Sequence, residues 1–545
     1  MRKALGGRLA AAIGTAGAVG VTAALVATPA TAVGAVAGST TAVSATVRTD
    51  KGLVRGTVTG DYRSFQGIPY AAPPVGELRW RSPHPAAAWA GVRDATAPGA
   101  LCAQSGDHLG QSSQAEDCLY LNVTTPPKAA PGKRLPVLVW VHGGSFKDGA
   151  GSLYGARRLA VQGQAVVVTI NYRLGVFGFL AHPALDQERE LSGDFGLQDQ
   201  QAALRWVRRN AAVFGGDPAN VTLAGESSGA ISTCAQLTAP GSAGLFDRAI
   251  VQSAPCTAPS GSSMAMANNP RPRAQAERDG EALVERLKLD AAPTAERLRQ
   301  VPVQELLKAA ADAAQPGFGP VVGGSVLPED PARAIAGGRF HHVPVLAGTN
   351  HDEERMHVWG LEMAKYGGPI PADAYIDEVR AAFGDDAEEV LARYPLSRYA
   401  SASQALATAL TDAEYAKPAL DTYNALSRRV PTYAYEFADT NAPWFAGVPK
   451  PYAMGAYHAA ELPYLFETTG TEPLTESQQP LSDQMIGYWT RFARTGAPNG
   501  SAAPVWQRFT PTRPYVQSLA PGEHGIKPAS FARDHDYAFW NSLGG

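Results

Sequence analysis

The stretch that decides the fold is residues 221–230, which read VTLAGESSGA. The first four residues form a short apolar run, which favours a buried β-strand. Residues 225–229 then give the pattern G-x-S-x-G, and a run of helical composition follows to Leu237. Between a strand and a helix, this pattern is typical of a nucleophile elbow, a turn so tight that side chains beside the serine would collide. Ser227 is therefore the candidate nucleophile.

Around this stretch, short apolar runs alternate with helical patterns. The other runs are 135–141 (LPVLVWV), 165–170 (AVVVTI), 249–251 (AIV) and 343–347 (VPVLA). Residues 198–214 place arginines and an asparagine opposite apolar side chains, as expected of a crossover helix that ends at a glycine pair. This alternation predicts an α/β fold with a doubly wound, mostly parallel sheet. We interpret 257–335 and 355–445 as helical insertions over the sheet edge, with independent domains as the alternative.

Composition and the N-terminus suggest an exported globular protein. Of the 545 residues, 45% are hydrophobic and 18% are charged, which suits a large core, and the net charge of −3 argues against nucleic acid or acidic lipid as partners. Residues 1–32 have a basic start, an apolar stretch and an Ala-x-Ala end, typical of a cleaved export signal; an uncleaved membrane anchor is the alternative. We expect 33–46 to be a flexible mature N-terminus and 47–545 to form one domain, secreted and without a membrane partner.

The four cysteines are Cys102, Cys118, Cys234 and Cys256. An even number in an exported chain favours disulfides, and nearest-neighbour pairing is the simplest scheme. None has C-x-x-C spacing, and 351–357 (HDEERMH) lacks the H-E-x-x-H arrangement of two histidines on one helix face. We therefore expect no metal and no other cofactor.

A serine hydroxyl becomes a useful nucleophile when a base takes its proton and an acid orients that base. In this fold type the acid and the histidine follow the serine in the chain. Asp352 and Glu353 come just after the run 343–347, and His458 is the best-patterned histidine further on, ahead of His524 and His535. The run 135–141 leads into His142 and the glycine-rich loop 143–146, which suits an oxyanion hole of backbone N–H groups.

Several motifs in order resemble one known family, the type-B carboxylesterases, which are related to the cholinesterases. They are 65–71 (FQGIPYA), 73–76 (PPVG), 116–122 (EDCLYLN), 171–173 (NYR), 195–200 (FGLQDQ), 214–218 (FGGDP) and the elbow. The resemblance covers nearly all of the mature chain. It implies an α/β-hydrolase fold with helical insertions over the active site, and hydrolysis of small-molecule esters without a cofactor.

The resemblance also assigns roles to residues. Ser227 corresponds to the nucleophile, His458 to the general acid/base and Glu353 to the orienting carboxylate; the oxyanion donors correspond to Gly144, Ser145 and Ser228. It supports a Cys102–Cys118 bridge and leaves the pairing of Cys234 and Cys256 less certain. The family usually has Gly at Ser145 and Ala at Ser228, but both replacements keep the backbone N–H. Because the Cβ of Ser145 narrows the hole, we expect esters of tertiary alcohols to be poor substrates.

Other residues in these motifs have structural interpretations. We expect Glu116, Asp199 and Asp217 to form ion pairs, with Arg79 and Arg173 as partners. We expect Glu226 to hydrogen-bond behind the site, His142 to be a packed residue, and Ser253 to be either a support for the acid or a plain strand-end serine.

Competing functions remain at this point. An inactive cholinesterase-like adhesion or binding protein usually lacks a triad member, whereas all three positions are present here. A choline esterase would place an aromatic side chain in the first disulfide loop, but residues 103–117 contain none. No segment resembles the interfacial lid of a lipase. A carbamate or nitrobenzyl-ester hydrolase would share the same chemistry, and the oligomeric state is open.

Overall fold

The computed structural model describes residues 43–106, 111–127, 134–186, 191–258, 269–289, 293–311, 317–501 and 503–543. The expected export signal, residues 1–32, lies outside the described residues. Strand β1 (Val43–Arg48) begins within the segment that we expected to be flexible. Among the described residues, strand structure is present from Val43, four residues before Val47, because β1 pairs along its whole length with β2 (Leu53–Val58).

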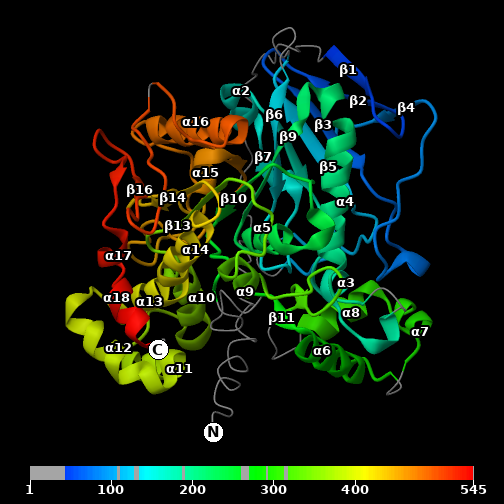
Figure 1. Cartoon of the computed structure of the whole chain (residues 1–545). Helices are drawn as coiled ribbons and strands as arrows, with labels where there is room; N and C mark the ends of the chain where they lie inside the picture. Colours follow the sequence, from blue (N-terminus) through cyan, green and yellow to red (C-terminus); the bar gives the residue numbers. More distant parts are fainter. Residues whose placement is uncertain are drawn as a thin grey trace, which may run out of the picture.

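A 13-stranded sheet runs through the protein in the order β1-β2-β3-β5-β8-β6-β9-β10-β13-β14-β16-β17, with β4 beside β2 (Figure 1). Neighbours from β8 to β16 are parallel, whereas β1-β2-β3-β5-β8 and β16-β17 pair antiparallel. The remaining strands of the sheet are β3 (Arg63–Pro69), β4 (Val92–Asp94), β5 (Tyr120–Thr125), β6 (Leu135–Val141), β8 (Val166–Ile170), β9 (Gly216–Glu226), β10 (Arg248–Gln252), β13 (Val345–Asn350), β14 (Thr432–Phe437), β16 (Val516–Leu519) and β17 (Lys527–Pro528). The expected doubly wound, mostly parallel sheet is confirmed.

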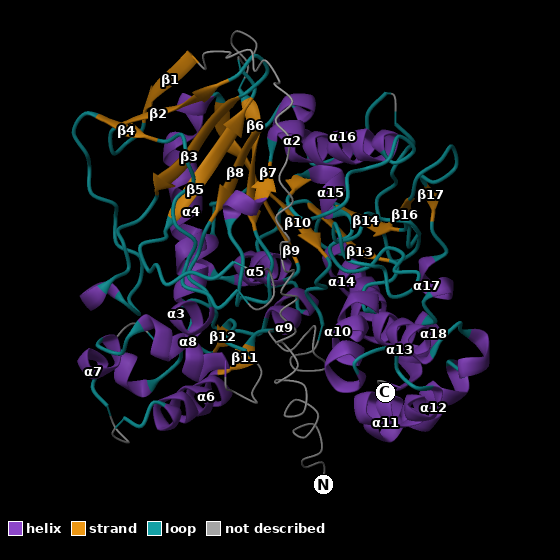
Figure 2. Ribbon diagram, turned by 180° about the vertical axis from the view of Figure 1, so that it is seen from behind, coloured by secondary structure: helices purple, strands orange, loops and turns teal. Residues whose placement is uncertain are grey.

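Helices cover both faces of this sheet and one of its ends. Their bounds are α2 (Arg157–Gly163), α3 (Gly175–Phe179), α4 (Phe195–Asn210), α5 (Ser228–Thr238), α6 (Arg273–Arg286), α7 (Ala295–Arg299), α8 (Val303–Ala311), α9 (Pro331–Ala336), α10 (Arg355–Tyr366), α11 (Tyr375–Phe383), α12 (Ala387–Arg393), α13 (Ala402–Thr411), α14 (Lys417–Ser427), α15 (Leu462–Leu465), α16 (Gln479–Thr495), α17 (Phe531–Asp534) and α18 (Tyr537–Leu543). Figures 1 and 2 show α6–α8 and α10–α12 as two groups at the end of the molecule opposite β1 and β2.

The apolar runs are buried on both faces because each face of the sheet has its own core. In β6, Val137, Val139 and Val141 pack in the core that contains apolar residues of α4 and α5. The alternate residues Leu138 and Trp140 pack in a second core with α2 and α16. The two-residue period of a strand sends successive side chains to opposite faces, which explains the uninterrupted apolar sequence.

The second expected helical insertion, 355–445, needs a correction, because it also contains the central strand β14. The sequence of β14, TYAYEF, carries a glutamate and three aromatic residues rather than an aliphatic run. Glu436 is nevertheless 4% exposed. The first insertion, 257–335, is helical apart from a short pair of strands, β11 (Arg271–Pro272) and β12 (Val321–Val322).

Candidate active site

Ser227 lies between β9 and α5 in a backbone conformation that few residues adopt. Its φ is 55° and its ψ is −125°, and its N–H donates to the carbonyl of Gln252 at 2.9 Å. A Cβ at Gly225 would lie 2.2 Å from the carbonyl oxygen of Gly229, and one at Gly229 would lie 2.1 Å from that of Val141. The turn therefore requires both glycines, and it presents Ser227 at the carboxyl end of the parallel strands.

Glu353 and His458 are 105 residues apart in sequence and are hydrogen-bonded to each other. Glu353 follows β13 and is fully buried, and its Oε2 lies 2.6 Å from Nδ1 of His458. Its Oε1 accepts the backbone N–H of Asn350 at 2.7 Å. In the neutral imidazole, this bond fixes the proton on Nδ1 and leaves the lone pair on Nε2, the form required of a general base.

Glu226 connects His458 to the elbow. Its Oε1 lies 3.3 Å from Nε2 of His458, and burial, followed by the charges of Glu461 and Glu353, raises its pKa well above the usual range. Within the described chain, no hydrogen bond joins the Ser227 hydroxyl to His458. Catalytic hydrogen bonds are often long before a substrate binds, so this geometry is compatible with a triad.

The proposed oxyanion donors lie in two loops next to the elbow. Gly144 and Ser145 have φ values of 103° and 56°, so the loop turns through left-handed conformations that direct successive N–H groups to one side. Ser228 is the first residue of α5, where a backbone N–H has no partner within the helix. In the described part of the chain, none of these three N–H groups has a hydrogen-bond acceptor. All three are available to a ligand oxygen.

Behind His458 lies a buried polar network that the sequence analysis did not identify. Glu461 accepts hydrogen bonds from the amides of Gln252 at 2.9 Å and Asn350 at 2.8 Å. Trp489 donates its indole N–H to Gln252 at 2.8 Å, and Asn350 also donates to the carbonyl of Tyr457 at 2.8 Å. The signal was available in sequence, since Gln252 and Asn350 are polar residues at the ends of two apolar strands.

Two other residues lie near this centre. Burial lowers the pKa of His142 to about 4, and its ring stacks on Tyr172 with centroids 4.5 Å apart. His142 is therefore a neutral packed residue. Ser253 has a φ of 56°, and its hydroxyl is buried without a hydrogen-bond partner among the described residues, so it makes no bond to Glu353.

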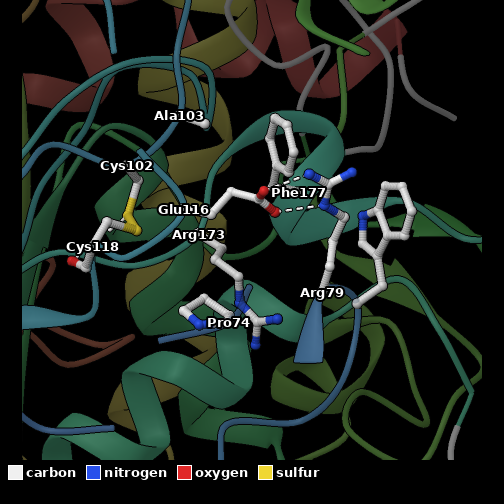
Figure 3. A pocket seen from close by; sticks show the side chains of 9 residues that line it. Pro74, Arg79, Cys102, Ala103, Glu116, Cys118, Arg173 and Phe177 are labelled. Carbon is white, nitrogen blue, oxygen red and sulfur yellow. Dashed lines mark hydrogen bonds and ion pairs between the residues drawn. A yellow bond between two sulfur atoms is a disulfide. The ribbon is translucent and has the colours of Figure 1, made fainter. Parts of the chain in front are cut away.

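Arg79 and Arg173 form the ion pairs that we expected from the sequence. Arg173 pairs with Asp199 through two hydrogen bonds of 2.7 Å. Arg79 pairs with Glu116 at a cavity of about 10 Å³ beside a disulfide (Figure 3). That volume suits one water and not an ester. The ion pair expected for Asp217 is wrong, because this carboxylate accepts the backbone N–H of Ala219 in its own turn.

The structure contains the disulfides Cys102–Cys118 and Cys234–Cys256. The first closes the loop that carries Gln104. This side chain accepts the backbone N–H of Gly149 at 2.7 Å and donates to its carbonyl at 3.4 Å, which anchors the disulfide loop beside the glycine-rich loop.

One cluster of potential metal ligands exists among the described residues. His351, Glu436 and His535 bring ligand atoms within 4.8 Å of one another. His535, however, bonds to Asp412 at 2.5 Å through Nδ1 and to Glu436 at 2.7 Å through Nε2. Although burial opposes its charge, these carboxylates raise its pKa to about 10, so both ring nitrogens are used in an ion pair.

Comparison with known proteins identifies the family of the chain. The sequence model of the carboxylesterase family matches residues 43–540. Para-nitrobenzyl esterase of Bacillus subtilis (strain 168) is 37% identical over 482 residues, covering 84% of this chain and 91% of the relative. Fumonisin B1 esterase of Sphingopyxis macrogoltabida is 36% identical over 488 residues, covering 85% and 84%. A solved carboxylesterase of Geobacillus stearothermophilus has a TM-score of 0.75 and 33% identity, covering 91% of this chain and 99% of that one. The chain has the α/β-hydrolase fold and belongs to the carboxylesterase family, type-B serine hydrolases that act on carboxylic esters.

Proposed function

We propose that this chain cleaves carboxylic esters through an acyl-enzyme on Ser227, with His458 as general acid/base and Glu353 as the carboxylate that orients it. The observation that carries the proposal is the 2.6 Å bond between Glu353 and Nδ1 of His458, formed beside a serine held in an elbow. The family membership supports the same assignment.

In the first half of the reaction, the Ser227 hydroxyl attacks the ester carbonyl while Nε2 of His458 takes its proton. The carbonyl oxygen becomes negatively charged and is bound by the N–H groups of Gly144, Ser145 and Ser228. Each such donor contributes about 10²- to 10³-fold to the rate. His458 then donates its proton to the departing alcohol. Water repeats the attack on the acyl-enzyme and releases the acid.

Glu226 supports this cycle if it stays protonated. Burial raises its pKa and favours the neutral form, in which it adds no third full charge beside Glu353 and the imidazolium. Because Glu226 already touches Nε2, a small rotation of His458 transfers this contact to Ser227 when a substrate binds.

The substrates we propose are small esters without a quaternary ammonium. Choline esters are bound through cation–π contacts, and the first disulfide loop, residues 103–117, contains no aromatic side chain for them. With α8, this loop also lines a cavity of about 510 Å³, through residues that include Gln104, Ser113, Gln114, Gln304 and Lys308, none of which belongs to the proposed triad. Carbamates and nitrobenzyl esters fit the same chemistry, and a lipase or an inactive binding protein is a weaker alternative.

We also propose that the protein is secreted after removal of residues 1–32. Two disulfides are typical of an oxidising compartment outside the cytosol. Among the described residues, no helix has the length and apolar character needed to cross a membrane. Mass spectrometry of the protein from culture medium should give a chain that begins at Val33. A full-length chain retained in the membrane fraction would overturn this proposal.

The central test is Ser227→Ala. We expect this variant to lose hydrolysis of 4-nitrophenyl butyrate and labelling by a fluorophosphonate probe, while its unfolding transition stays unchanged because only one hydroxyl is removed. Ser253→Ala removes another serine hydroxyl at a nearby strand end and is the matched control. This variant should keep both the hydrolysis of 4-nitrophenyl butyrate and the labelling by the probe. Retained turnover in Ser227→Ala would refute the assignment.

A further inference from the structure

A second histidine lies beside His458 and has no part in the triad. His357 is in the first turn of α10, and its ring centroid is 5.0 Å from that of His458. The ring of Tyr415 flanks His458 as well, at 5.8 Å. The side chain of His357 is 25% exposed, compared with 7% for His458, so part of this second imidazole is accessible to solvent.

A buried carboxylate lies against His357 and raises its pKa. Oε1 of Glu354 lies 3.2 Å from Nδ1 of His357, and the Glu354 side chain is 2% exposed. Among the described residues, His357 is the one ionic partner of Glu354. A buried carboxylate without a counter-charge is strongly unfavourable, which makes the imidazolium the stable partner. Burial lowers the pKa of His357, but the charge and hydrogen bond of Glu354 and the charge of Glu353 raise it more, and the net shift is upward.

The other ring nitrogen is free for a ligand. In the described chain, Nε2 of His357 has no hydrogen-bond acceptor, and in the charged ring this atom carries a proton. The ring centroids of His357 and His458 lie 5.0 Å apart, so this N–H can reach an anionic group that a substrate carries close to its ester bond. Of the groups beside it, Glu354 bonds to Nδ1 of the same ring, Glu353 bonds to Asn350 and His458, and Tyr415 is buried.

We propose that His357 is a specificity-determining residue that binds a carboxylate carried by the substrate within a few atoms of the ester bond. This inference rests on the proposed hydrolysis at Ser227 and names its preferred substrate class, esters that bear a free acid. The bound carboxylate would also offset the repulsion between the imidazolium of His357 and that of His458 during turnover. Charge-assisted hydrogen bonds of this kind change binding by roughly 10- to 100-fold.

The test compares acidic esters with uncharged partners of the same size at neutral pH. One pair carries the acid on the acyl side, 4-nitrophenyl hydrogen glutarate and its methyl ester. The other pair carries the acid on the alcohol side and consists of 3-acetoxypropanoate and its methyl ester. Its hydrolysis is measured as the release of acetate. The measured quantity is the ratio of kcat/KM for acidic over neutral ester. A fall in active protein cancels in this ratio, so a poorly folding variant still gives a valid answer.

We expect His357→Gln to lower this ratio by about 10-fold or more in at least one pair, since glutamine keeps a hydrogen-bond donor but loses the charge. The pair that responds identifies the side that carries the carboxylate. His351→Gln removes a histidine from the end of the same segment and should leave the ratio unchanged.

An unchanged ratio in both pairs for His357→Gln, or an equal fall in His351→Gln, would overturn the inference. Failure of the proposed function is distinguishable, because then Ser227→Ala would hydrolyse the neutral esters as fast as the unaltered protein does.

Discussion

Replacement of Glu353 by glutamine tests whether this carboxylate orients His458 as we propose. Both oxygens of Glu353 accept N–H groups, one from the backbone of Asn350 at 2.7 Å and one from Nδ1 of His458 at 2.6 Å. A glutamine amide has one acceptor and one donor. Because the backbone N–H cannot change its role, the amide oxygen must stay on Asn350, and the amide nitrogen then faces His458. The imidazole adopts the other tautomer, with its proton on Nε2, and can no longer accept the proton of Ser227.

The expected loss is large although the change in shape is small. Neutralising the orienting acid of a Ser-His-acid triad lowers kcat by about 10⁴-fold through the wrong tautomer. We expect a loss of this size for Glu353→Gln, measured as kcat for 4-nitrophenyl butyrate near neutral pH. Circular dichroism and the denaturant midpoint should show that the variant is folded.

The neighbouring carboxylate supplies the control. Asp352 accepts the backbone N–H of Ala456 at 3.0 Å and pairs with Arg355 at 2.7 Å, and it does not touch His458. Asp352→Asn should therefore keep kcat within about tenfold, since it removes an ion pair and no catalytic contact. The reasoning is refuted if Glu353→Gln retains more than about a tenth of the activity, or if Asp352→Asn loses as much.

Three further predictions concern the oxyanion loop, a disulfide and the C-terminal ion pair. We expect the unaltered protein to hydrolyse n-butyl acetate far faster than tert-butyl acetate. Ser145→Gly removes a Cβ at a φ of 56° and should raise the turnover of tert-butyl acetate relative to that of n-butyl acetate. Equal turnover of the two esters by the unaltered protein would contradict this prediction. Cys234→Ala with Cys256→Ala opens a loop of 22 residues and should lower the free energy of unfolding by about 3 kcal/mol in denaturant titrations. His535→Gln should destabilise the protein most below pH 6.5, and this difference should shrink as the pH rises toward about 10, because the folded-state pKa lies above the unfolded value; a difference that does not depend on pH would oppose it.

The parts of the structure that could be predicted from sequence are those in which a local pattern has one physical solution. The run before Ser227 and the two glycines around it leave no other backbone path, since a Cβ at either glycine would lie about 2 Å from a carbonyl oxygen. The aliphatic runs likewise identify five parallel strands. The strand β14 was missed because its sequence contains Glu436, and the buried histidine that neutralises this residue, His535, lies 99 residues further along the chain.

Partners that are distant in sequence also explain which residues of the site could not be predicted. Glu461 is three residues after His458 and looks like an ordinary polar residue of a helix start. Its role appears only when β10 and β13 bring the amides of Gln252 and Asn350 to its two oxygens. The pairing of His357 with Glu354 is local in sequence, but its position 5.0 Å from the ring of His458 depends on the whole fold. Sequence therefore indicates reactive groups more readily than the partners that set their charge.

Three buried carboxyl groups, Glu353, Glu461 and Glu226, lie in and behind the proposed triad, and their hydrogen bonds differ. Glu353 accepts two N–H groups. Burial raises the pKa of Glu461, and its two amide donors offset only part of that shift. Oε1 of Glu226 has no hydrogen-bond partner in the described chain beyond its contact with His458. Burial and the charges of Glu461 and Glu353 raise the pKa of Glu226 well above the usual range, which favours its neutral form. In the proposed mechanism, Glu353 therefore stabilises the imidazolium along Nδ1, while a neutral Glu226 adds no further charge and gives up its contact with Nε2 to Ser227.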